Sequence, residues 1–271
     1  MKNFRGQVHG RALGLWLALA ALMAGCVSTT TTTSGAEPAR TPSEPADPDK
    51  RAQVRLELAA LYLGRGQADT ALEEVQKALA AKPDLPDAYN LRALALASKG
   101  DNALADQSFQ RALQLAPREG GTMHNYGWFL CQQQRWTEAE TQFTNALAQP
   151  QYRDATRTLL AQGVCQARAG RWAEAERTLS RSYELDPANP VTAYNLSDVL
   201  LRRGELERAR FYISRINAQP ELSSAQSLWL AARIERRLGN VQGVQEFGRK
   251  LQERFPTSAE VLLFERGRFD D

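Results

Sequence analysis

Small and large apolar residues recur along most of the chain with a period of 34 to 36 residues. Within a period, small residues tend to stand at positions 8, 20 and 27, and larger apolar residues at positions 11 and 24. A glycine near position 15 and a proline near position 32 divide the period into two helical stretches, because glycine favours the left-handed end of a helix and proline stops one. The six units begin at Ala52, Pro86, Gly120, Thr156, Pro190 and Ala225.

The first unit follows this pattern closely. It supplies Ala59, Tyr62, Gly66, Ala71, Val75, Ala78 and Pro83. The third unit has Gln134 where the glycine is expected, and the sixth unit departs furthest from the pattern. The period and the positions match the tetratricopeptide repeat (TPR), in which small residues let neighbouring helices approach and larger residues fill the gaps between them.

A two-helix unit of this kind cannot bury its apolar face alone, so repeated units stack on one another. We therefore predict an all-α fold, a right-handed superhelical solenoid of six TPR helix pairs within residues 51–271. The stretch SAEVLLFER at residues 258–266 is predicted to form a C-terminal capping helix.

The first 25 residues differ from the repeats. Residues 1–11 are polar and basic, and residues 12–25 form an apolar run that is shorter than the ~20 residues of a membrane-spanning helix. We therefore predict a cleaved signal peptide over residues 1–25. The segment LMAGC ending at Cys26 resembles a bacterial lipoprotein box, which implies that Cys26 receives a diacylglycerol group, becomes the first residue and is N-acylated. The alternative is a plain signal peptide cleaved at another Ala or Gly.

Residues 26–50 are predicted to be a lipidated cysteine followed by a Thr/Pro-rich tether. Beyond Val27 the segment has no large apolar side chain, so nothing offsets the entropy cost of ordering it. In lipoproteins of this kind an Asp after the cysteine commonly signals retention in the inner membrane. By the same resemblance, Val27 implies a protein anchored by lipid to the outer membrane and facing the periplasm.

Charge argues against nucleic acid as a partner. The chain has 34 Lys and Arg residues against 31 Asp and Glu residues, a formal net charge of +3. Lys2, Arg5 and Arg11 lie in the predicted signal peptide, which has no acid, so the remainder is neutral. A nucleic-acid-binding protein needs a basic domain or a dense basic stripe.

Two stretches of the predicted concave face are candidate binding grooves. TPR arrays resemble one another in binding partner segments on a face built by positions 2, 5, 9, 12 and 13 of the first helix. In the first two units this face carries Leu56, Ala60, Leu63, Asn90, Leu94 and Ala97. An exposed apolar trough usually marks an interaction site. The alternative is that Leu56 and Leu63 are stacking residues that no preceding repeat covers.

The corresponding face of the last two units is rich in arginine. It carries Asp198, Arg202, Arg233, Arg236 and Arg237, with Tyr194 and Trp229 nearby. Arginine beside aromatic residues suits acidic or carboxylate-bearing segments. The alternative is a solvated helix face with arginine stems lying along apolar surface.

If Cys26 is lipidated, Cys131 and Cys165 remain as a pair in a chain exported to an oxidising compartment. Both lie late in the first helix of adjacent units, at positions 12 and 10, which is compatible with a disulfide that joins the third repeat to the fourth. Two buried free thiols are the alternative.

Catalytic signals are sparse, and we expect no enzyme, cofactor or metal. After cleavage only His124 remains among the histidines, and it has no Cys or His at metal-ligand spacing. The sequence lacks GxSxG, HExxH and phosphate-loop motifs. The pairs Glu138/Glu140 and Glu174/Glu176 are most simply solvated charges on the outer face of the second helices.

The third unit contains the segment MHNYGWFLC, which ends at Cys131. With the N-terminal lipoprotein signal, six TPR units and Cys165 in the next repeat, the chain resembles the type IV pilus biogenesis lipoproteins of the PilF/PilW family. The resemblance implies a pilotin, a monomeric outer-membrane lipoprotein that binds the secretin PilQ through its TPR groove and promotes its localisation and multimerisation. The alternative is a TPR adaptor lipoprotein for cell-wall hydrolases or outer-membrane protein assembly.

Overall fold

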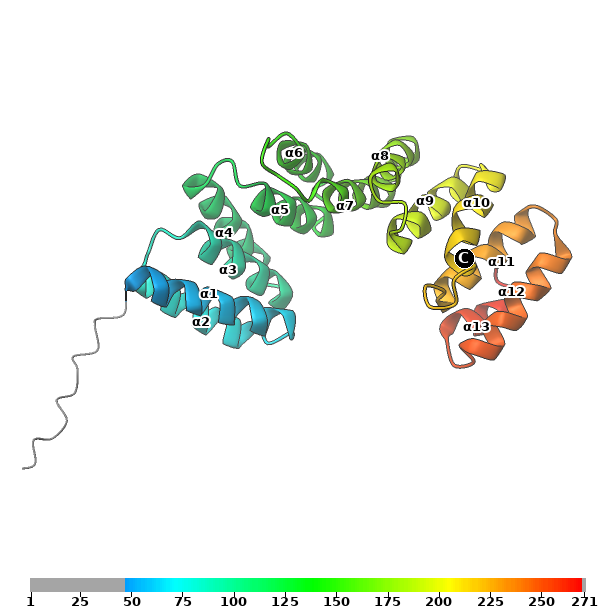
Figure 1. Ribbon diagram of the computed structural model, residues 1–271, viewed down its shortest axis with the longest axis horizontal. Helices are drawn as coiled ribbons and strands as arrows, with labels where there is room; N and C mark the ends of the chain where they lie inside the picture. The colour runs from blue at the N-terminus through cyan, green and yellow to red at the C-terminus, as the bar shows by residue number, and fades with distance from the viewer. Residues whose placement is uncertain (1–46, 270–271) are drawn as a thin grey trace, which may run out of the picture. The chain divides into compact units, whose positions relative to one another are not determined.

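The computed structural model describes residues 47–269, and all regular secondary structure in that range is helical. Twelve of the thirteen helices form six consecutive pairs, and the last helix follows the sixth pair (Figure 1). The prediction of an all-α TPR solenoid with six helix pairs and a C-terminal helix is confirmed. The helices are α1 (Pro48–Gly64), α2 (Ala68–Ala81), α3 (Pro86–Lys99), α4 (Asn102–Leu115), α5 (Gly120–Gln132), α6 (Trp136–Leu147), α7 (Ala155–Arg168), α8 (Trp172–Leu185), α9 (Pro190–Arg202), α10 (Leu206–Asn217), α11 (Ala225–Arg237), α12 (Val241–Arg254) and α13 (Ala259–Glu265).

The predicted signal peptide, Cys26 and the tether up to residue 46 lie outside the described residues. Between residues 47 and 269 no helix is long and apolar enough to cross a membrane. Helix α1 begins at Pro48, ahead of the first repeat position, because Asp47 caps it. The Asp47 carboxylate accepts a hydrogen bond of 3.0 Å from the backbone N–H of Asp49, and proline suits the first helical position.

The turn inside each pair requires one residue in the left-handed conformation. Five pairs use a glycine there, such as Gly100 with φ of 84°, whereas the third pair uses Gln134 with φ of 59°. A residue with a Cβ costs about 1–2 kcal/mol in this conformation. The backbone N–H of Arg135 nevertheless donates to the carbonyl of Leu130 at 2.9 Å, the same closure that the glycine turns make. The packing of the two helices, and not the glycine alone, therefore determines the turn.

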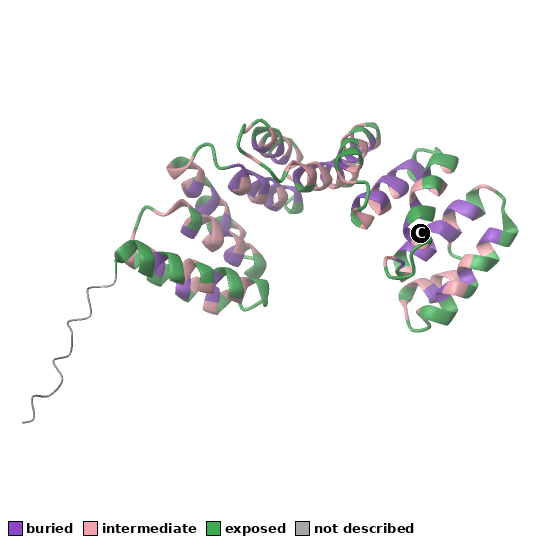
Figure 2. Cartoon of the chain, viewed as in Figure 1, coloured by how far each residue is buried: buried purple, intermediate pink, exposed green. Residues whose placement is uncertain are grey.

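Close helix contacts explain two other glycines. A Cβ on Gly127 of α5 would lie 2.9 Å from the ring of Phe143 in α6, and one on Gly163 of α7 would lie 2.6 Å from Leu179 in α8. Each first helix also contacts the first helix of the next pair. Buried residues consequently lie between the helices, and exposed residues cover the turns and outer faces (Figure 2).

Charged pairs link the second helix of one repeat to the following repeat. They are Asp106 with Arg135 at 2.6 Å, Glu140 with Arg171 at 3.2 Å, Glu176 with Arg208 at 2.6 Å and Arg210 with Glu235 at 2.7 Å. The expectation that Glu140 and Glu176 are simply solvated was therefore wrong. Glu176 is only 9% exposed and also pairs with Arg203. A glutamate on the face of the helix that turns toward the next repeat is covered when the repeats stack.

Candidate functional site: the groove of the first two repeats

A hollow on the first two repeats lies between α1 and α3. Its volume is about 650 Å³, and it brings together three of the predicted groove residues, Leu56, Ala60 and Asn90. The remaining lining residues are Asp49, Gln53, Glu57, Lys82, Leu85, Asp87 and Leu91. Leucines at its floor and charged groups at its edge give it the composition of a site for an amphipathic segment of another protein.

The other three predicted groove residues lie elsewhere on the same two repeats. Leu63 lines a second hollow of about 550 Å³, which the turn after α1 forms with Ser98 and Lys99 at the end of α3. Leu94 and Ala97 are half-buried and pack against the apolar cluster of the second and third repeats. The six residues therefore do not form one continuous trough, because Leu94 and Ala97 pack against a neighbouring apolar cluster and Leu63 lines a different hollow from Leu56 and Ala60.

Sequence reasoning missed Leu85, Leu91 and Lys82 of the groove. Leu85 is the N-cap residue of α3, and Lys82 follows the last residue of α2, so both lie outside the helix positions that the repeat pattern assigns to the face. Lys82 reaches across to Asp49 of α1, with 3.0 Å between Nζ and Oδ1. This exposed ion pair borders the groove and contributes at most about 1 kcal/mol.

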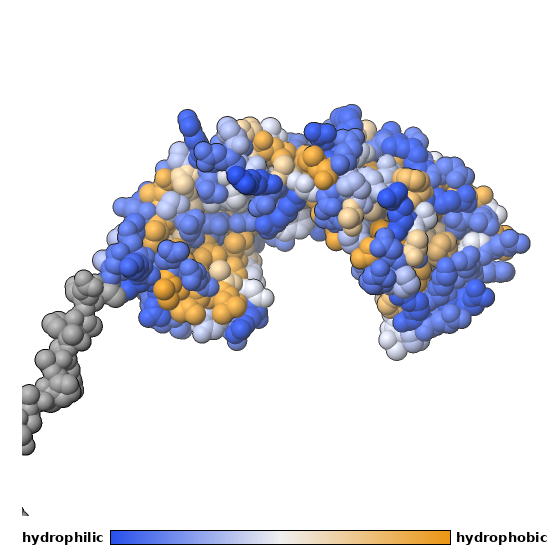
Figure 3. All heavy atoms as spheres, in the orientation of Figure 1, coloured by the Kyte–Doolittle hydropathy of each residue, from blue (hydrophilic) through white to orange (hydrophobic). Residues whose placement is uncertain are grey.

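Helix α1 is unusually open on its other side as well. Only Ala52 and Ala59 of this helix are buried, while Val54 is 55% and Leu61 is 48% exposed. Figure 3 shows apolar atoms gathered over α1 and α2. Apolar patches of this kind on soluble proteins mark contact surfaces for other proteins or membranes.

A buried glutamate holds the two helices of the first pair together beneath this surface. Glu74 of α2 accepts hydrogen bonds from Lys77 at 2.7 Å and from Arg55 of α1 at 2.8 Å. These two bonds hold the pKa of Glu74 below its ordinary value. The carboxylate therefore stays charged near neutral pH and keeps α1 in register with α2.

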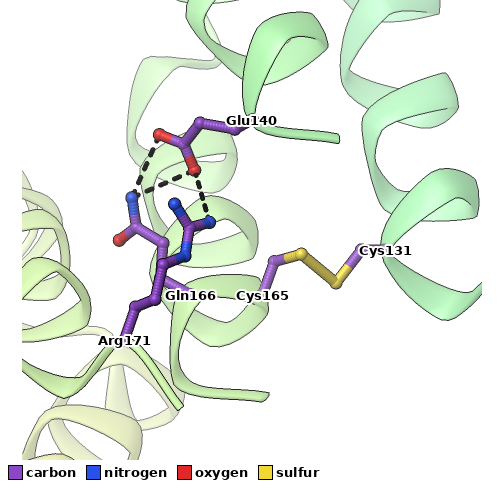
Figure 4. The surroundings of a disulfide bond; sticks show 5 residues. All are labelled: Cys131, Glu140, Cys165, Gln166 and Arg171. Atoms are coloured by element: carbon purple, nitrogen blue, oxygen red, sulfur yellow. Dashed lines mark hydrogen bonds and ion pairs between the residues drawn. A yellow bond between two sulfur atoms is a disulfide. The ribbon is translucent and has the colours of Figure 1, made fainter. Parts of the chain in front are cut away.

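The predicted cysteine pair forms a disulfide in the structure. Cys131 of α5 and Cys165 of α7 are both 1% exposed, and their Cα atoms are 5.8 Å apart. Beside the disulfide, Glu140 of α6 accepts hydrogen bonds from Gln166 and Arg171 of the fourth repeat (Figure 4). A covalent bond and a partly buried polar cluster thus join the third and fourth repeats.

His124 is buried between the third and fourth repeats and lies beside polar side chains. It is 5% exposed, and its Nδ1 lies 2.8 Å from Oγ1 of Thr158, which Tyr152 contacts at 2.6 Å. Burial, and to a smaller extent the charge of Arg157, lowers the pKa of His124 to about 4, so the imidazole is neutral near pH 7. Among the described residues, no group of three or more His, Cys, Asp and Glu side chains could hold a metal ion.

Comparison with known proteins matches this architecture. The tetratricopeptide repeat family matches residues 56–119 and 130–190, and a second tetratricopeptide repeat model matches residues 166–234. Over 247 residues the chain is 28% identical to the type IV pilus assembly protein PilF of Pseudomonas aeruginosa, with 91% of this chain and 95% of PilF covered.

Two solved structures extend the comparison to three dimensions. The crystal structure of PilW, described as a widely conserved type IV pilus biogenesis factor, has a TM-score of 0.72 and 31% identity, with 78% of this chain and 96% of PilW covered. The structure of Pseudomonas aeruginosa PilF has a TM-score of 0.69 and 25% identity, with 81% of this chain and 99% of PilF covered. The chain therefore belongs to the family of tetratricopeptide-repeat type IV pilus biogenesis proteins that includes PilF and PilW.

Proposed function

We propose that this protein is a pilotin, an outer-membrane lipoprotein that binds the secretin PilQ through the groove of its first two repeats. In this role it promotes the localisation of PilQ to the outer membrane and its multimerisation. The observation that carries the proposal is the hollow between α1 and α3, which belongs to the first repeats within residues 47–269 of a chain related along its length to PilF and PilW.

The chemistry of the groove supports a protein partner. Leu56, Leu85 and Leu91 offer apolar contact, and Asp87 and Glu57 offer charge at the edge. A secretin subunit in transit exposes strand edges and apolar surface that would otherwise aggregate. A groove that covers one such segment needs no bond-making step.

Anchoring completes the proposal. Lipidation at Cys26 would fix the protein to the membrane, because acyl chains contribute about 0.8 kcal/mol for each buried CH₂ group and two or more chains anchor stably. The tether up to residue 46 would then restrict the groove to a shell near the bilayer and raise the local concentration of a captured secretin there.

The genetic test measures secretin multimers that resist heating in SDS. Deleting the gene should remove these multimers from the outer membrane, and the wild-type gene should restore them. A Cys26→Ala variant should restore them poorly, although the folded repeats are unchanged. Normal multimers in the deletion strain would contradict the pilotin proposal, and co-purification with cell-wall hydrolases in place of PilQ would favour the adaptor function.

A further inference from the structure

The chain after α13 turns back onto the sixth repeat. Gly267 adopts the left-handed conformation, with φ of 65°, and reverses the direction of the backbone. The ring of Phe269 then lies 4.9 Å from that of Trp229 in α11 and 6.0 Å from that of Phe264, measured between ring centroids. Trp229 is only 6% exposed beneath these two rings.

Two arginines of α11 also contact Phe269. We call the site formed by Trp229, Phe264 and these two arginines the seat of Phe269. Arg233 Nε donates a hydrogen bond of 3.1 Å to the backbone carbonyl of Phe269, and the guanidinium of Arg236 lies over the Phe269 ring, 5.7 Å from its centroid. Aromatic packing, a cation–π contact and a bond to the main chain are the interactions by which a groove binds an extended peptide. Phe269 is therefore held by the same kinds of interaction that hold a peptide from another protein.

The seat continues across the neighbouring repeat. Arg233 of α11 approaches Asp198 of α9, with 3.9 Å between Nη1 and Oδ1, and Asp198 also accepts a hydrogen bond of 2.9 Å from Arg202. Tyr194 lies in the same neighbourhood, and burial, followed by the charge of Asp198, raises its pKa. Tyr194 and Asp198 occupy the repeat positions that Leu56 and Ala60 occupy in the proposed PilQ groove.

Charge on this face favours an acidic occupant. Arg202, Arg233, Arg236 and Arg237 stand against the two nearby carboxylates of Asp198 and Glu260. The chain itself continues after Phe269 with two aspartates. Arginine binds carboxylates with paired, charge-assisted hydrogen bonds, so an aromatic residue followed by acids complements both parts of the seat.

We propose that this face of α9 and α11 binds a partner segment in which an aromatic residue precedes acidic residues, and that Phe269 holds the same place until such a segment displaces it. The site is separate from the proposed PilQ groove, so either proposal can fail without the other. One main-chain hydrogen bond and one half-buried ring on a glycine turn make Phe269 a replaceable occupant.

The test is a peptide-binding measurement on the full mature chain. The probe is a fluorescently labelled peptide with the sequence RGRFDD, which reproduces residues 266–271, and the readout is fluorescence anisotropy. A competitor binds only chains in which Phe269 has left its place, so an occupancy of about nine-tenths, which we take as the working value of the proposal, weakens its apparent affinity about tenfold. The Phe269→Ala variant should therefore bind the probe about tenfold more tightly than the wild type.

Two controls make the result specific. Phe211 is an exposed phenylalanine of α10 that also lies beneath an arginine, Arg215, so Phe211→Ala should bind the probe as the wild type does. A probe with alanine in place of its phenylalanine should not bind the Phe269→Ala protein. The double variant Phe269→Ala/Arg233→Gln should not bind the original probe.

A second readout reports on the Phe269 position itself. In the Phe269→Ala chain labelled with 5-fluorotryptophan, saturating probe should move the ¹⁹F resonance of Trp229 towards its wild-type position, because the probe's phenylalanine replaces the missing ring. A Trp229→Phe variant assigns the resonance. Equal affinity of the wild type and Phe269→Ala, binding of the alanine probe, or an unmoved Trp229 resonance would each overturn the proposal and leave Phe269 as a structural cap.

Discussion

The first and last helix pairs of the repeat array differ in how much of their first helix is buried. At the first pair, α1 buries only two residues, both alanines, and leaves Val54 and Leu61 about half exposed. At the last pair, α11 buries eight residues, and α13 and Phe269 cover it. In a solenoid each repeat covers its neighbour, so an end without a cover retains apolar surface. Within residues 47–269, large apolar side chains of the terminal first helix therefore stay exposed at the first pair.

The two ends also differ in how their grooves are filled. The hollow between α1 and α3 is lined by leucines and by polar and charged residues of the first two repeats. The corresponding face of α9 and α11 already holds Phe269, bound by Arg233 and Trp229. A groove that is open can bind its partner directly, whereas a groove that is occupied binds only a segment able to displace the occupant.

The largest expected effect comes from removing one leucine at each end. Leu228 of α11 is 1% exposed and packs with Leu251 and Val261, so Leu228→Ala should lower the free energy of unfolding by about 2–5 kcal/mol. Leu61→Ala in α1 should change it by less than about 0.5 kcal/mol. Urea denaturation followed by circular dichroism checks both values. Equal losses at the two sites would mean that α1 is covered in solution.

A smaller effect is expected at the joint between the two halves of the array. The disulfide closes a loop with a sequence separation of 34 residues, for which the chain-entropy model gives a stabilisation of about 2–4 kcal/mol. Replacing Cys131 and Cys165 by serine should lower the free energy of unfolding by that amount and increase amide hydrogen exchange at the joint. Unchanged exchange in α5 and α7 would show that packing alone holds the joint.

The third effect is a dependence of stability on pH that originates between the two ends. Burial lowers the pKa of His124 to about 4, whereas an unfolded histidine titrates near 6.5. The unfolded chain therefore binds the proton first, and the stability contributed by neutral His124 is complete above about pH 6.5 and is lost as the pH falls to about 4. The total loss is about 3 kcal/mol at 1.36 kcal/mol for each pKa unit.

The pH effect is measured as a difference between two proteins. Unfolding free energies of the wild type and of His124→Gln, compared from pH 7 to pH 4, should diverge because only the wild type carries the histidine. Parallel curves would show that His124 is solvated in the folded protein.

Much of the fold could be predicted because it repeats. Gly100 and the equivalent glycines predict the turns of five pairs, and the spacing of small residues predicts each helix pair. Gln134 shows the limit of this reasoning, because its left-handed conformation is imposed by the two helices that it joins. The repeat pattern therefore predicts a turn in the third pair, although Gln134 by itself does not favour the left-handed conformation.

The site could be predicted only in part, because it depends on contacts between repeats. Leu56 and Ala60 line one hollow, but Leu63 lines another, and Leu85 enters the first hollow from outside the helix positions of the pattern. The pairing of Glu176 with arginines of the next repeat likewise depends on how neighbouring repeats stack, which the pattern within one repeat does not give. The seat of Phe269 depends on the backbone reversal at Gly267, which no repeat position encodes.

The most direct test of the central claim measures binding of purified PilQ to three forms of the mature protein. Ala60 is an exposed residue of α1 in the groove, and Ala80 is an exposed residue of α2 outside it. Ala60→Arg should weaken PilQ binding at least about tenfold, a loss of about 1.4 kcal/mol, whereas Ala80→Arg should bind as the wild type does. Both variants should retain the wild-type helicity and melting temperature. Equal PilQ binding by all three proteins would contradict the claim that the open groove of the first two repeats binds the secretin.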